Sequence, residues 1–525
     1  MTRPNILFVF PDQWRGDWLG ALSPELPLRT PTIDRLIAGG TAFRRAWTPS
    51  PLCVPARSCL ATARSYGRAP APDNTCANPI DADTFYRRLS EAGYEVASFG
   101  KTDLFKPDRS WGKDGRHRVN GVDKLAAIGI PAGKDIAGKH DSAEAAEDGC
   151  SDPYTDLLAR AGVIDSYVKD LAERSEDSPL PVSDWEAGAI VEPETCYANT
   201  APSPLPPELY ADNVVGQDAL DYLGTVNADA PWFLMVNFPG PHEPMDVTGD
   251  MIENWRDVTF PQPYGRRAED RELQNEIRRR YAAMLENIDV WFGRMIAELS
   301  RRDMLENTVI VFASDHGEML GDRNLWKKQV PFEPSLNVPL VWNGPDIAAR
   351  GIEDAPASLI DIPVTLLSLA GAAPLSRADG LDLSCYLKGR EAYPRRFTHA
   401  GLGAWRAVTD GRWKLVLGYR NDQPLSRMQF GSFQADITAG ARLYDLNVDL
   451  LETTNLWDIN CEERNRLMRE LRKLFGDTQA PSGFKLLSEE RTPSGLIMCR
   501  LENTGNGSAG TYVRGQTNLV GAAQD

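Results

Sequence analysis

The sequence predicts an α/β protein: a large, mainly parallel β-sheet sandwiched between helices, with a smaller C-terminal α+β subdomain. Short runs of β-favouring apolar residues recur along the chain, and both faces of each run are apolar, as in strands buried between two helical layers. Longer amphipathic stretches separate these runs, and such alternation is typical of a parallel sheet. The length of 525 residues leaves room for the second unit.

The individual elements follow from this alternation. The predicted strands are residues 5–10, 94–99, 232–238, 308–313 and 338–342. The predicted helices are residues 83–92, 208–223, 271–301 and 360–370. We expect a main domain over 1–396. Within it, residues 103–207 are rich in Gly, Pro and acidic residues and are predicted to form irregular insertions near the mouth of the active site.

A smaller subdomain is predicted over residues 397–487. Residues 405–409 and 413–417 flank Asp410-Gly411, a pair favoured in tight turns, and are predicted to form a hairpin. Residues 443–446 would add a strand, and 462–475 an amphipathic helix. The Gly-, Ser- and Asn-rich residues 488–525 are predicted to be an extended tail.

Composition and charge exclude several classes of protein. The chain has 57 Lys and Arg against 74 Asp and Glu, a net charge of −17, which argues against general binding to nucleic acid or anionic membranes. The N-terminal MTRPNILFVF lacks the features of a secretory signal, and no stretch reaches the length of a membrane span. The eight scattered cysteines contain no C-x-x-C pair. We therefore expect reduced thiols and a cytoplasmic location.

Chemically capable residues follow four of the predicted strands. They are Asp12-Gln13, Gly100-Lys101-Thr102-Asp103, Pro241-His242-Glu243 and Ser314-Asp315-His316-Gly317-Glu318. In α/β sheets ligands bind beyond the carboxyl ends of the strands, so these residues are predicted to meet at one edge. Asp12, Asp315 and His316 are suited to a divalent cation such as Ca²⁺, Mg²⁺ or Mn²⁺, although a helix cap and a turn would explain them equally well. The chain has only five histidines, and two of them lie at strand ends, which favours the functional interpretation.

The segment SPLCVPARSCLATAR, residues 50–64, places a cysteine at a helix start. Cys53 and Arg57 are four residues apart and would share one helix face. Pro55 fits only the first turn of a helix, so Cys53 would lie at the N-terminus, where backbone N–H groups favour an anion. The alternative is a buried cysteine and a surface arginine without function.

The segment Cys53-Val54-Pro55-Ala56-Arg57 resembles the C-x-P-x-R core of the formylglycine-dependent (type I) sulfatases of the alkaline phosphatase superfamily. The similarity covers roughly the first 475 residues in the family's order. It runs from Pro4-Asn5-Ile6-Leu7 through the His316 motif to Leu443-Tyr444-Asp445-Leu446 and Glu452-Thr453-Thr454-Asn455-Leu456. It implies an alkaline phosphatase-like fold with a catalytic domain over 1–396. It also implies a maturation enzyme that converts Cys53 to formylglycine.

The resemblance implies a role for each site residue. Cys53, as formylglycine hydrate, would be the nucleophile. One metal ion, Ca²⁺ or Mn²⁺, would be held by Asp12, Gln13, Cys53, Asp315 and His316. Arg57 would hold the hydrate, Asn74 a substrate oxygen, and Lys101, His242 and Lys328 the sulfate and leaving group, with His242 or Lys328 protonating the leaving oxygen.

Three departures from the common pattern refine the comparison. Gln13 replaces a second aspartate, and His316 stands where many members have Asn, which is similar to the choline-sulfatase and phosphonate monoester hydrolase branch. Thr62-Ala63 replaces the usual Thr-Gly after the nucleophile helix. Asp103 replaces the histidine of Gly-Lys-x-His, as in arylsulfatase K and its bacterial relatives, which hints at a sulfated uronate substrate. We expect Asp103 to serve as the base that releases sulfate.

Three functions remain open at this point. The first is hydrolysis of a small sulfate ester. The second is hydrolysis of a phosphonate monoester or phosphodiester by the same residues, because tetrahedral anionic esters are similar in shape. The third is a non-catalytic binding protein with unmodified Cys53. Beyond substrate and maturation enzyme we expect no nucleic-acid or membrane partner, and a homo-oligomer is consistent with this branch.

Overall fold

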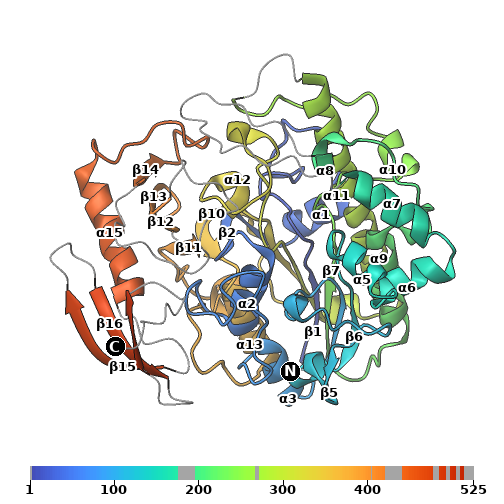
Figure 1. Ribbon diagram of the computed structural model, residues 1–525, viewed down its shortest axis with the longest axis horizontal. Helices are drawn as coiled ribbons and strands as arrows, with labels where there is room; N and C mark the ends of the chain where they lie inside the picture. The colour runs from blue at the N-terminus through green and yellow to red at the C-terminus, as the bar shows by residue number, and fades with distance from the viewer. Residues whose placement is uncertain are drawn as a thin grey trace.

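The computed structural model describes residues 3–174, 195–265, 271–403, 405–419, 440–476, 484–491, 497–503 and 509–513. Its centre is an eight-stranded sheet in the order β10-β2-β9-β8-β1-β7-β3-β6 (Figure 1). The strands are β1 (Asn5–Val9), β2 (Thr41–Trp47), β3 (Glu95–Gly100), β6 (Ala132–Asp135), β7 (Trp232–Asn237), β8 (Thr308–Ala313), β9 (Leu340–Asn343) and β10 (Gly351–Ser358). Strand β9 runs antiparallel to β2 and β8, and the other neighbours are parallel. The predicted α/β class is confirmed.

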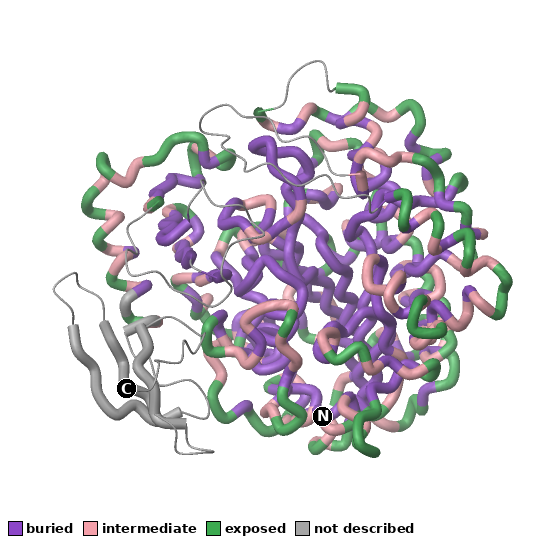
Figure 2. Tube along the Cα trace, in the orientation of Figure 1, coloured by how far each residue is buried: buried purple, intermediate pink, exposed green. Residues whose placement is uncertain are grey.

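Helices cover both faces of this sheet. On one side lie α1 (Pro31–Ala38), α9 (Ala211–Thr225), α10 (Gly249–Glu253) and α11 (Arg271–Arg301). On the other side lie α2 (Cys53–Thr62), α3 (Phe85–Glu91), α13 (Asp361–Ala370) and α14 (Ser384–Leu387). Successive residues of β1 point to opposite faces, so Leu7 and Val9 pack into the first layer and Ile6 and Phe8 into the second. Figure 2 shows the buried centre that results.

The five predicted strands of the sheet are present, and three further strands were not predicted. Strand β2 carries Arg44 and Arg45, which interrupt its apolar pattern and point out of the core. Strand β10 lies at one edge of the sheet and β6 at the other, and their first residues are only partly buried. Strands that bury only part of their length do not produce the continuous apolar runs by which buried strands are recognised.

Where the structure describes it, the insertion predicted as irregular contains several helices and short strands, and it also supplies β6 of the central sheet. It contains β4 (Arg118–Val119), β5 (Val122–Asp123), α4 (Lys124–Ala127), α5 (Asp141–Glu147), α6 (Pro153–Arg160), α7 (Ile164–Arg174) and α8 (Thr195–Ala198). The side chain of Asp152 accepts a hydrogen bond from the Thr155 amide and Pro153 occupies the first turn, which starts α6. Tyr154 and Leu158 then pack into the core. Residues 175–194 of the insertion lie outside the described residues.

The C-terminal subdomain is an antiparallel sheet with one long helix. Strands β11 (Thr398–Leu402), β12 (Trp405–Thr409), β13 (Trp413–Leu417) and β14 (Arg442–Asp445) are neighbours in that order, and α15 (Cys461–Gly476) packs on β12 and β13. The predicted hairpin pairs Thr409 with Lys414. Where an extended tail was predicted, β15 (Phe484–Arg491), β16 (Ile497–Asn503) and β17 (Ala509–Val513) form a three-stranded antiparallel sheet. The remaining residues of that tail, including 514–525, lie outside the described part of the chain.

A buried charge cluster joins the subdomain to helix α12 of the main domain. Lys414 of β13 is fully buried, and its Nζ lies 2.8 Å from Glu333 of α12 (Glu333–Leu336) and 2.7 Å from Glu452. Glu452 also accepts a hydrogen bond from the Glu333 amide at 2.7 Å. A buried lysine needs such partners to offset its lost hydration. The Glu452 motif singled out in the sequence therefore holds the two units together.

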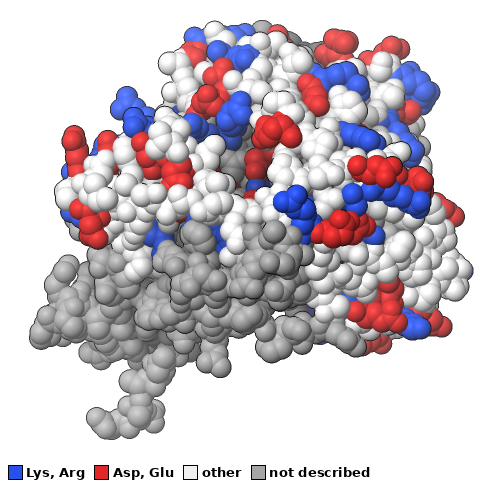
Figure 3. Space-filling view, turned by 90° about the horizontal axis from the view of Figure 1, so that it is seen from above, with Lys and Arg blue, Asp and Glu red and all other residues white. Residues whose placement is uncertain are grey.

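Three further features concern the surface charge, the membrane-spanning potential of the helices and the pairing of the cysteines. On the face seen in Figure 3, acidic and basic side chains are interspersed. In the described parts of the chain, no helix combines the length and apolar character needed to span a membrane. None of the seven cysteines whose side chains are described forms a disulfide.

Candidate active site

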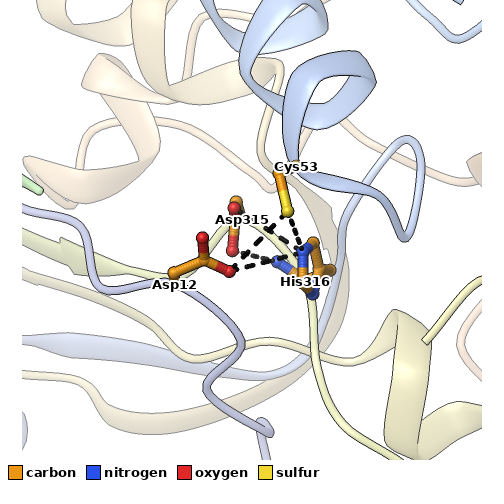
Figure 4. Close-up of side chains that lie close together, drawn as sticks. All are labelled: Asp12, Cys53, Asp315 and His316. Carbon is orange, nitrogen blue, oxygen red and sulfur yellow. Dashed lines mark hydrogen bonds and ion pairs between the residues drawn. The ribbon is translucent and has the colours of Figure 1, made fainter. Parts of the chain in front are cut away.

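Four side chains meet where strands β1 and β8 and helix α2 end or begin (Figure 4). Asp12 follows β1, Asp315 and His316 follow β8, and Cys53 is the first residue of α2. His316 Nε2 lies 3.3 Å from Cys53 Sγ, 3.5 Å from Asp12 Oδ1 and 3.7 Å from Asp315 Oδ2. All four side chains are buried. The sequence therefore predicted correctly that these residues come together.

The cluster fits a single divalent cation. Each residue offers one ligand atom, and all of these atoms lie within 4.8 Å of one another. His316 Nδ1 is 3.1 Å from the Gly317 carbonyl, which can only accept, so Nδ1 carries the proton and Nε2 presents its lone pair to the cluster. Although burial opposes ionisation of Asp12, Lys101 beside it holds the pKa of that carboxyl well below its usual range. Asp12, Cys53, Asp315 and His316 are thus a ready set of metal ligands.

Helix α2 begins at Cys53 because the preceding residue is extended and Pro55 follows. Leu52 has φ −155° and ψ 136°, and Pro55 occupies the first turn, where a missing N–H costs nothing. Asn74 Oδ1 accepts a hydrogen bond of 3.1 Å from the Val54 amide, so Asn74 lies at the same helix end as Cys53. Burial, together with the charge of Asp12, raises the pKa of the Cys53 thiol to about 12. An unmodified Cys53 without a metal is therefore a protonated thiol and a poor nucleophile.

Arg57 lies one turn along the same helix, and its side chain ties three loops together. Its Nε donates to Asp315 at 2.9 Å, and its Nη1 donates to the side chain of Asn237 at 3.1 Å and to the Lys101 carbonyl at 2.5 Å. Its Nη2 lies 3.7 Å from Asp12 and has no hydrogen-bond partner among the described residues. Asn237, the last residue of β7, was not predicted as a site residue. A buried Asn at the end of an apolar strand was the available signal.

Lys101 and Asp103 follow β3, and Lys101 faces Cys53. Lys101 Nζ forms an ion pair with Asp12 and lies 3.2 Å from Asp103 and 3.8 Å from Cys53 Sγ. Burial opposes ionisation of Asp103, but Lys101 and Lys106 outweigh it and lower the pKa of Asp103. Asp103 is therefore ionised, which is the form that a base requires, but its lowered pKa makes it a weak proton acceptor. Its role as a base stays a prediction.

The remaining predicted residues form a chain of hydrogen bonds beside the four candidate metal ligands. Lys328 Nζ lies 2.5 Å from His242 Nε2 and donates to the side-chain oxygen of Gln13. His242 Nδ1 lies 2.8 Å from the Glu243 carbonyl. Because a carbonyl only accepts and an ammonium only donates, His242 is neutral with its proton on Nδ1. Burial and the nearby Lys328 lower its pKa in agreement with this. In this arrangement the amide oxygen of Gln13 accepts a hydrogen bond from Lys328, and the predicted role of Gln13 as a metal ligand stays a prediction.

Two buried carboxylates, Glu243 and Glu318, support this chain of hydrogen bonds, and neither was assigned a role from the sequence. The side-chain nitrogen of Gln13 donates to Glu243 at 2.6 Å and also to Glu318, which accepts a further bond of 2.8 Å from the Tyr197 hydroxyl. Burial and the charge of Glu243 raise the pKa of Glu318 to about 7. These partners fix the orientation of the Gln13 amide. Glu243 and Glu318 each lie within two residues of a predicted site histidine, which was the available signal.

Comparison with known proteins shows the family of the chain. The chain matches the family described as Sulfatase over residues 4–372, more than two thirds of its length. The chain belongs to the sulfatase family. It is 26% identical over 499 residues to an arylsulfatase of Clostridium perfringens, covering 90% of this chain and 94% of the relative. It is 28% identical over 491 residues to a choline-sulfatase of Rhizobium meliloti, covering 86% and 82%.

A solved structure supports the fold. The phosphonate monoester hydrolase of Agrobacterium radiobacter superposes with a TM-score of 0.68 at 23% identity, covering 94% of this chain and 99% of that one. The expected alkaline phosphatase-like architecture of this sulfatase is thereby confirmed. The protein is a hydrolase of the sulfatase class, and its individual site residues are assigned below as proposals.

Proposed function

We propose that the protein hydrolyses a small sulfate ester, with formylglycine derived from Cys53 as nucleophile and one divalent metal ion, Mn²⁺ or Ca²⁺. One observation carries the proposal: Cys53 lies at the N-terminus of α2, within 4 Å of the side chains of Asp12 and His316. A formylglycine hydrate would supply two hydroxyl groups, one to attack sulfur and one to expel sulfate afterwards. A metal held by the four-residue cluster would supply positive charge close to the sulfate.

The protein's own cations prepare the site for an anion. A sulfate ester repels nucleophiles because its oxygens are negative. Arg57, Lys101 and Lys328 place three positive side chains around residue 53, all nearly buried, where electrostatic stabilisation of developing charge is strong. The unpartnered Nη2 of Arg57 is available to one more acceptor. We assign Arg57 to the hydrate, and Asn74 and Lys101 to the sulfate oxygens.

Proton transfer to the leaving oxygen is assigned to Lys328. Its ammonium donates both to His242 Nε2 and to Gln13, so its protons are already directed into the site. Neutral His242 orients Lys328 and accepts a hydrogen bond from it. General acid catalysis needs a donor within hydrogen-bond reach of the leaving group, and Lys328 would be that donor.

A paired assay tests the proposal. Intact-mass and peptide mass spectrometry report whether Cys53 is converted, and kcat/KM is compared for an aryl sulfate and an aryl phosphonate monoester on the same preparation. We expect sulfate to be preferred and Cys53→Ala to abolish turnover. Cys59→Ala is the matched control, because Cys59 is a buried thiol on the same helix but belongs to the core. Turnover unchanged in Cys53→Ala would refute the proposal.

Phosphonate monoester or phosphodiester hydrolysis is the second candidate. It is kept because Gln13 and His316 resemble the branch that contains both choline-sulfatases and phosphonate monoester hydrolases, and because a solved phosphonate monoester hydrolase has the same fold. A higher kcat/KM for the aryl phosphonate would reassign the protein to this activity with the same nucleophile. Retained sulfate binding without turnover or conversion of Cys53 would instead indicate a binding protein.

The finer features are proposals as well. We infer a formylglycine-generating enzyme as partner, although Thr62-Ala63 replaces the usual Thr-Gly of its recognition segment. We further propose a catalytic domain over 1–396, a subdomain over 397–487 and a cytoplasmic location. The hint of a sulfated uronate substrate from Asp103, and a homo-oligomer, are tested by a substrate panel and by light scattering.

A further inference from the structure

A second group of potential metal ligands lies beside the active site. His140, His242 and Glu243 each offer one ligand atom, and all of these atoms lie within 4.8 Å of one another. His140 belongs to the insertion and precedes α5, whereas His242 and Glu243 follow β7. None of the functions assigned above uses His140. Its side chain is 37% exposed, so the group is open to ions from solvent.

We propose that His140, His242 and Glu243 form a Zn²⁺ site, separate from the Asp12 cluster, and that Zn²⁺ bound there inhibits the enzyme. Two imidazoles and one carboxylate with an open fourth position are the ligands that zinc takes in three-residue sites. Ca²⁺ and Mg²⁺ prefer oxygen ligands and do not compete for such a set. The binding half of the proposal does not depend on which ester the enzyme hydrolyses, whereas the inhibition half rests on the function proposed above for Lys328.

The separations between these atoms suit a shared ion. His140 Nε2 lies 3.8 Å from Glu243 Oε1, and His242 Nδ1 lies 3.2 Å from Glu243 Oε2. The first distance is too long for a hydrogen bond. Two atoms bound to one zinc ion at about 2.1 Å lie at most about 4.2 Å apart, and both distances satisfy this limit. The two rings meet edge to face with centroids 5.5 Å apart, and the ligand atoms of the third pair, His140 and His242, also lie within 4.8 Å of one another.

The surroundings hold the two ligand-bearing segments together. Lys139, next to His140, is buried and donates to the Pro244 carbonyl at 3.2 Å and to Asp246 at 2.7 Å, both just beyond Glu243. Gln13 donates to Glu243 Oε2 at 2.6 Å and orients the carboxylate. Such supporting hydrogen bonds to ligands are a regular feature of protein metal sites.

Inhibition follows from the proton on His242. In the structure Nδ1 donates to the Glu243 carbonyl and Nε2 accepts from Lys328. To bind zinc through Nδ1, the neutral ring must move its proton from Nδ1 to Nε2. Nε2–H then faces the Lys328 ammonium, two donors oppose each other, and Lys328 must withdraw. Zinc would thereby separate the proposed proton donor from its partner.

Zinc binding and activity are measured separately on the full chain. Titration calorimetry with Zn²⁺ alone is done in a Cys53→Ala background that is saturated with Mn²⁺, so that the sulfur of the first site cannot capture zinc. The variants are His140→Gln and, as matched control, Asp141→Asn, whose carboxylate lies 2.6 Å from Lys106. In the enzyme with its native residue 53, zinc inhibition is measured with and without 1 mM Ca²⁺, about a thousandfold above a micromolar zinc concentration.

We expect one zinc ion per chain and a zinc affinity at least about tenfold lower in His140→Gln. Loss of a residue that only supports a metal ligand already lowers metal affinity by about tenfold or more, so loss of a ligand should lower it at least as much. Asp141→Asn keeps the affinity, Ca²⁺ does not relieve inhibition, and His140→Gln resists zinc while retaining basal turnover. Equal zinc affinity in wild type and His140→Gln would overturn the proposal, and so would equal losses in both variants. Because calorimetry needs no turnover, its result is independent of the sulfatase assay.

Discussion

Lys139 offers a direct test of how the loop that carries His242 is held. Its side chain is 1% exposed, and its ammonium lies 2.7 Å from Asp246, 3.1 Å from the Tyr210 hydroxyl and 3.2 Å from the Pro244 carbonyl. Asp246 is 4% exposed. Lys139→Met keeps most of the side-chain volume but leaves the buried Asp246 without its cation.

The expected loss is large because the partner stays buried. Breaking a buried ion pair from one side costs about 3–5 kcal/mol of unfolding free energy. Burial raises the pKa of the neighbouring Asp212 to about 6, and Lys139 counteracts this rise, so its removal raises that pKa further. Lys134→Met is the matched control: Lys134 lies 2.6 Å from Asp218, but the two side chains are 44% and 24% exposed. An exposed ion pair contributes less than about 1 kcal/mol to the free energy of unfolding.

Urea denaturation followed by tryptophan fluorescence measures both variants. We expect Lys139→Met to lose about 3–5 kcal/mol, and a second substitution, Asp246→Leu, to recover a large part of it because no unpaired charge then remains. Two results would contradict the reasoning that burial makes this ion pair strong. One is an equally small loss of unfolding free energy in Lys139→Met and Lys134→Met, and the other is a double variant that is no more stable than Lys139→Met.

Three further predictions concern metal, catalysis and pH. Chelation should abolish activity and lower stability, since a metal at about 100 times its Kd adds about 2.7 kcal/mol, and thermal melts with and without Mn²⁺ should differ accordingly. Arg57→Lys should lower kcat/KM at least about 100-fold with the fold intact by circular dichroism, because a lysine cannot bond Asp315 and Asn237 together; near-wild-type kcat/KM would contradict this role. Burial lowers the pKa of His399 to about 4, so the unfolded chain takes up this proton near pH 6.5 and the folded chain only near pH 4. As the pH is lowered from about 6.5 to about 4, the free energy of unfolding should therefore fall by up to about 1.4 kcal/mol per pH unit. In His399→Gln the urea midpoint should depend less on pH across that range.

Much of the catalytic half was predictable because its signals are local. The buried strands β1, β7 and β8 are continuous apolar runs, and each is followed at once by the residues that the structure gathers, Asp12, His242 and Asp315 among them. Parallel strands bring their carboxyl ends to one edge, so a pattern spread over 300 residues of sequence predicts one cluster. Pro55 likewise predicts the start of the helix at Cys53.

The partners within that cluster were decided by the tertiary structure. Nothing near Gln13 in sequence indicates that Lys328 and Glu243 would bond its amide, or that His140 of the insertion would face Glu243. Contacts between segments far apart depend on how loops return over the sheet, and single-sequence patterns carry no record of that path. The helices of the insertion and the strands near the C-terminus were missed for a related reason: short elements gain their stability from packing against the rest of the fold rather than from their own residues. The sequence by itself determined the sheet and the chemical groups at its edge, because both follow from periodicity and residue type. Only the folded chain decided which group holds which proton, because that depends on atoms brought within hydrogen-bond distance.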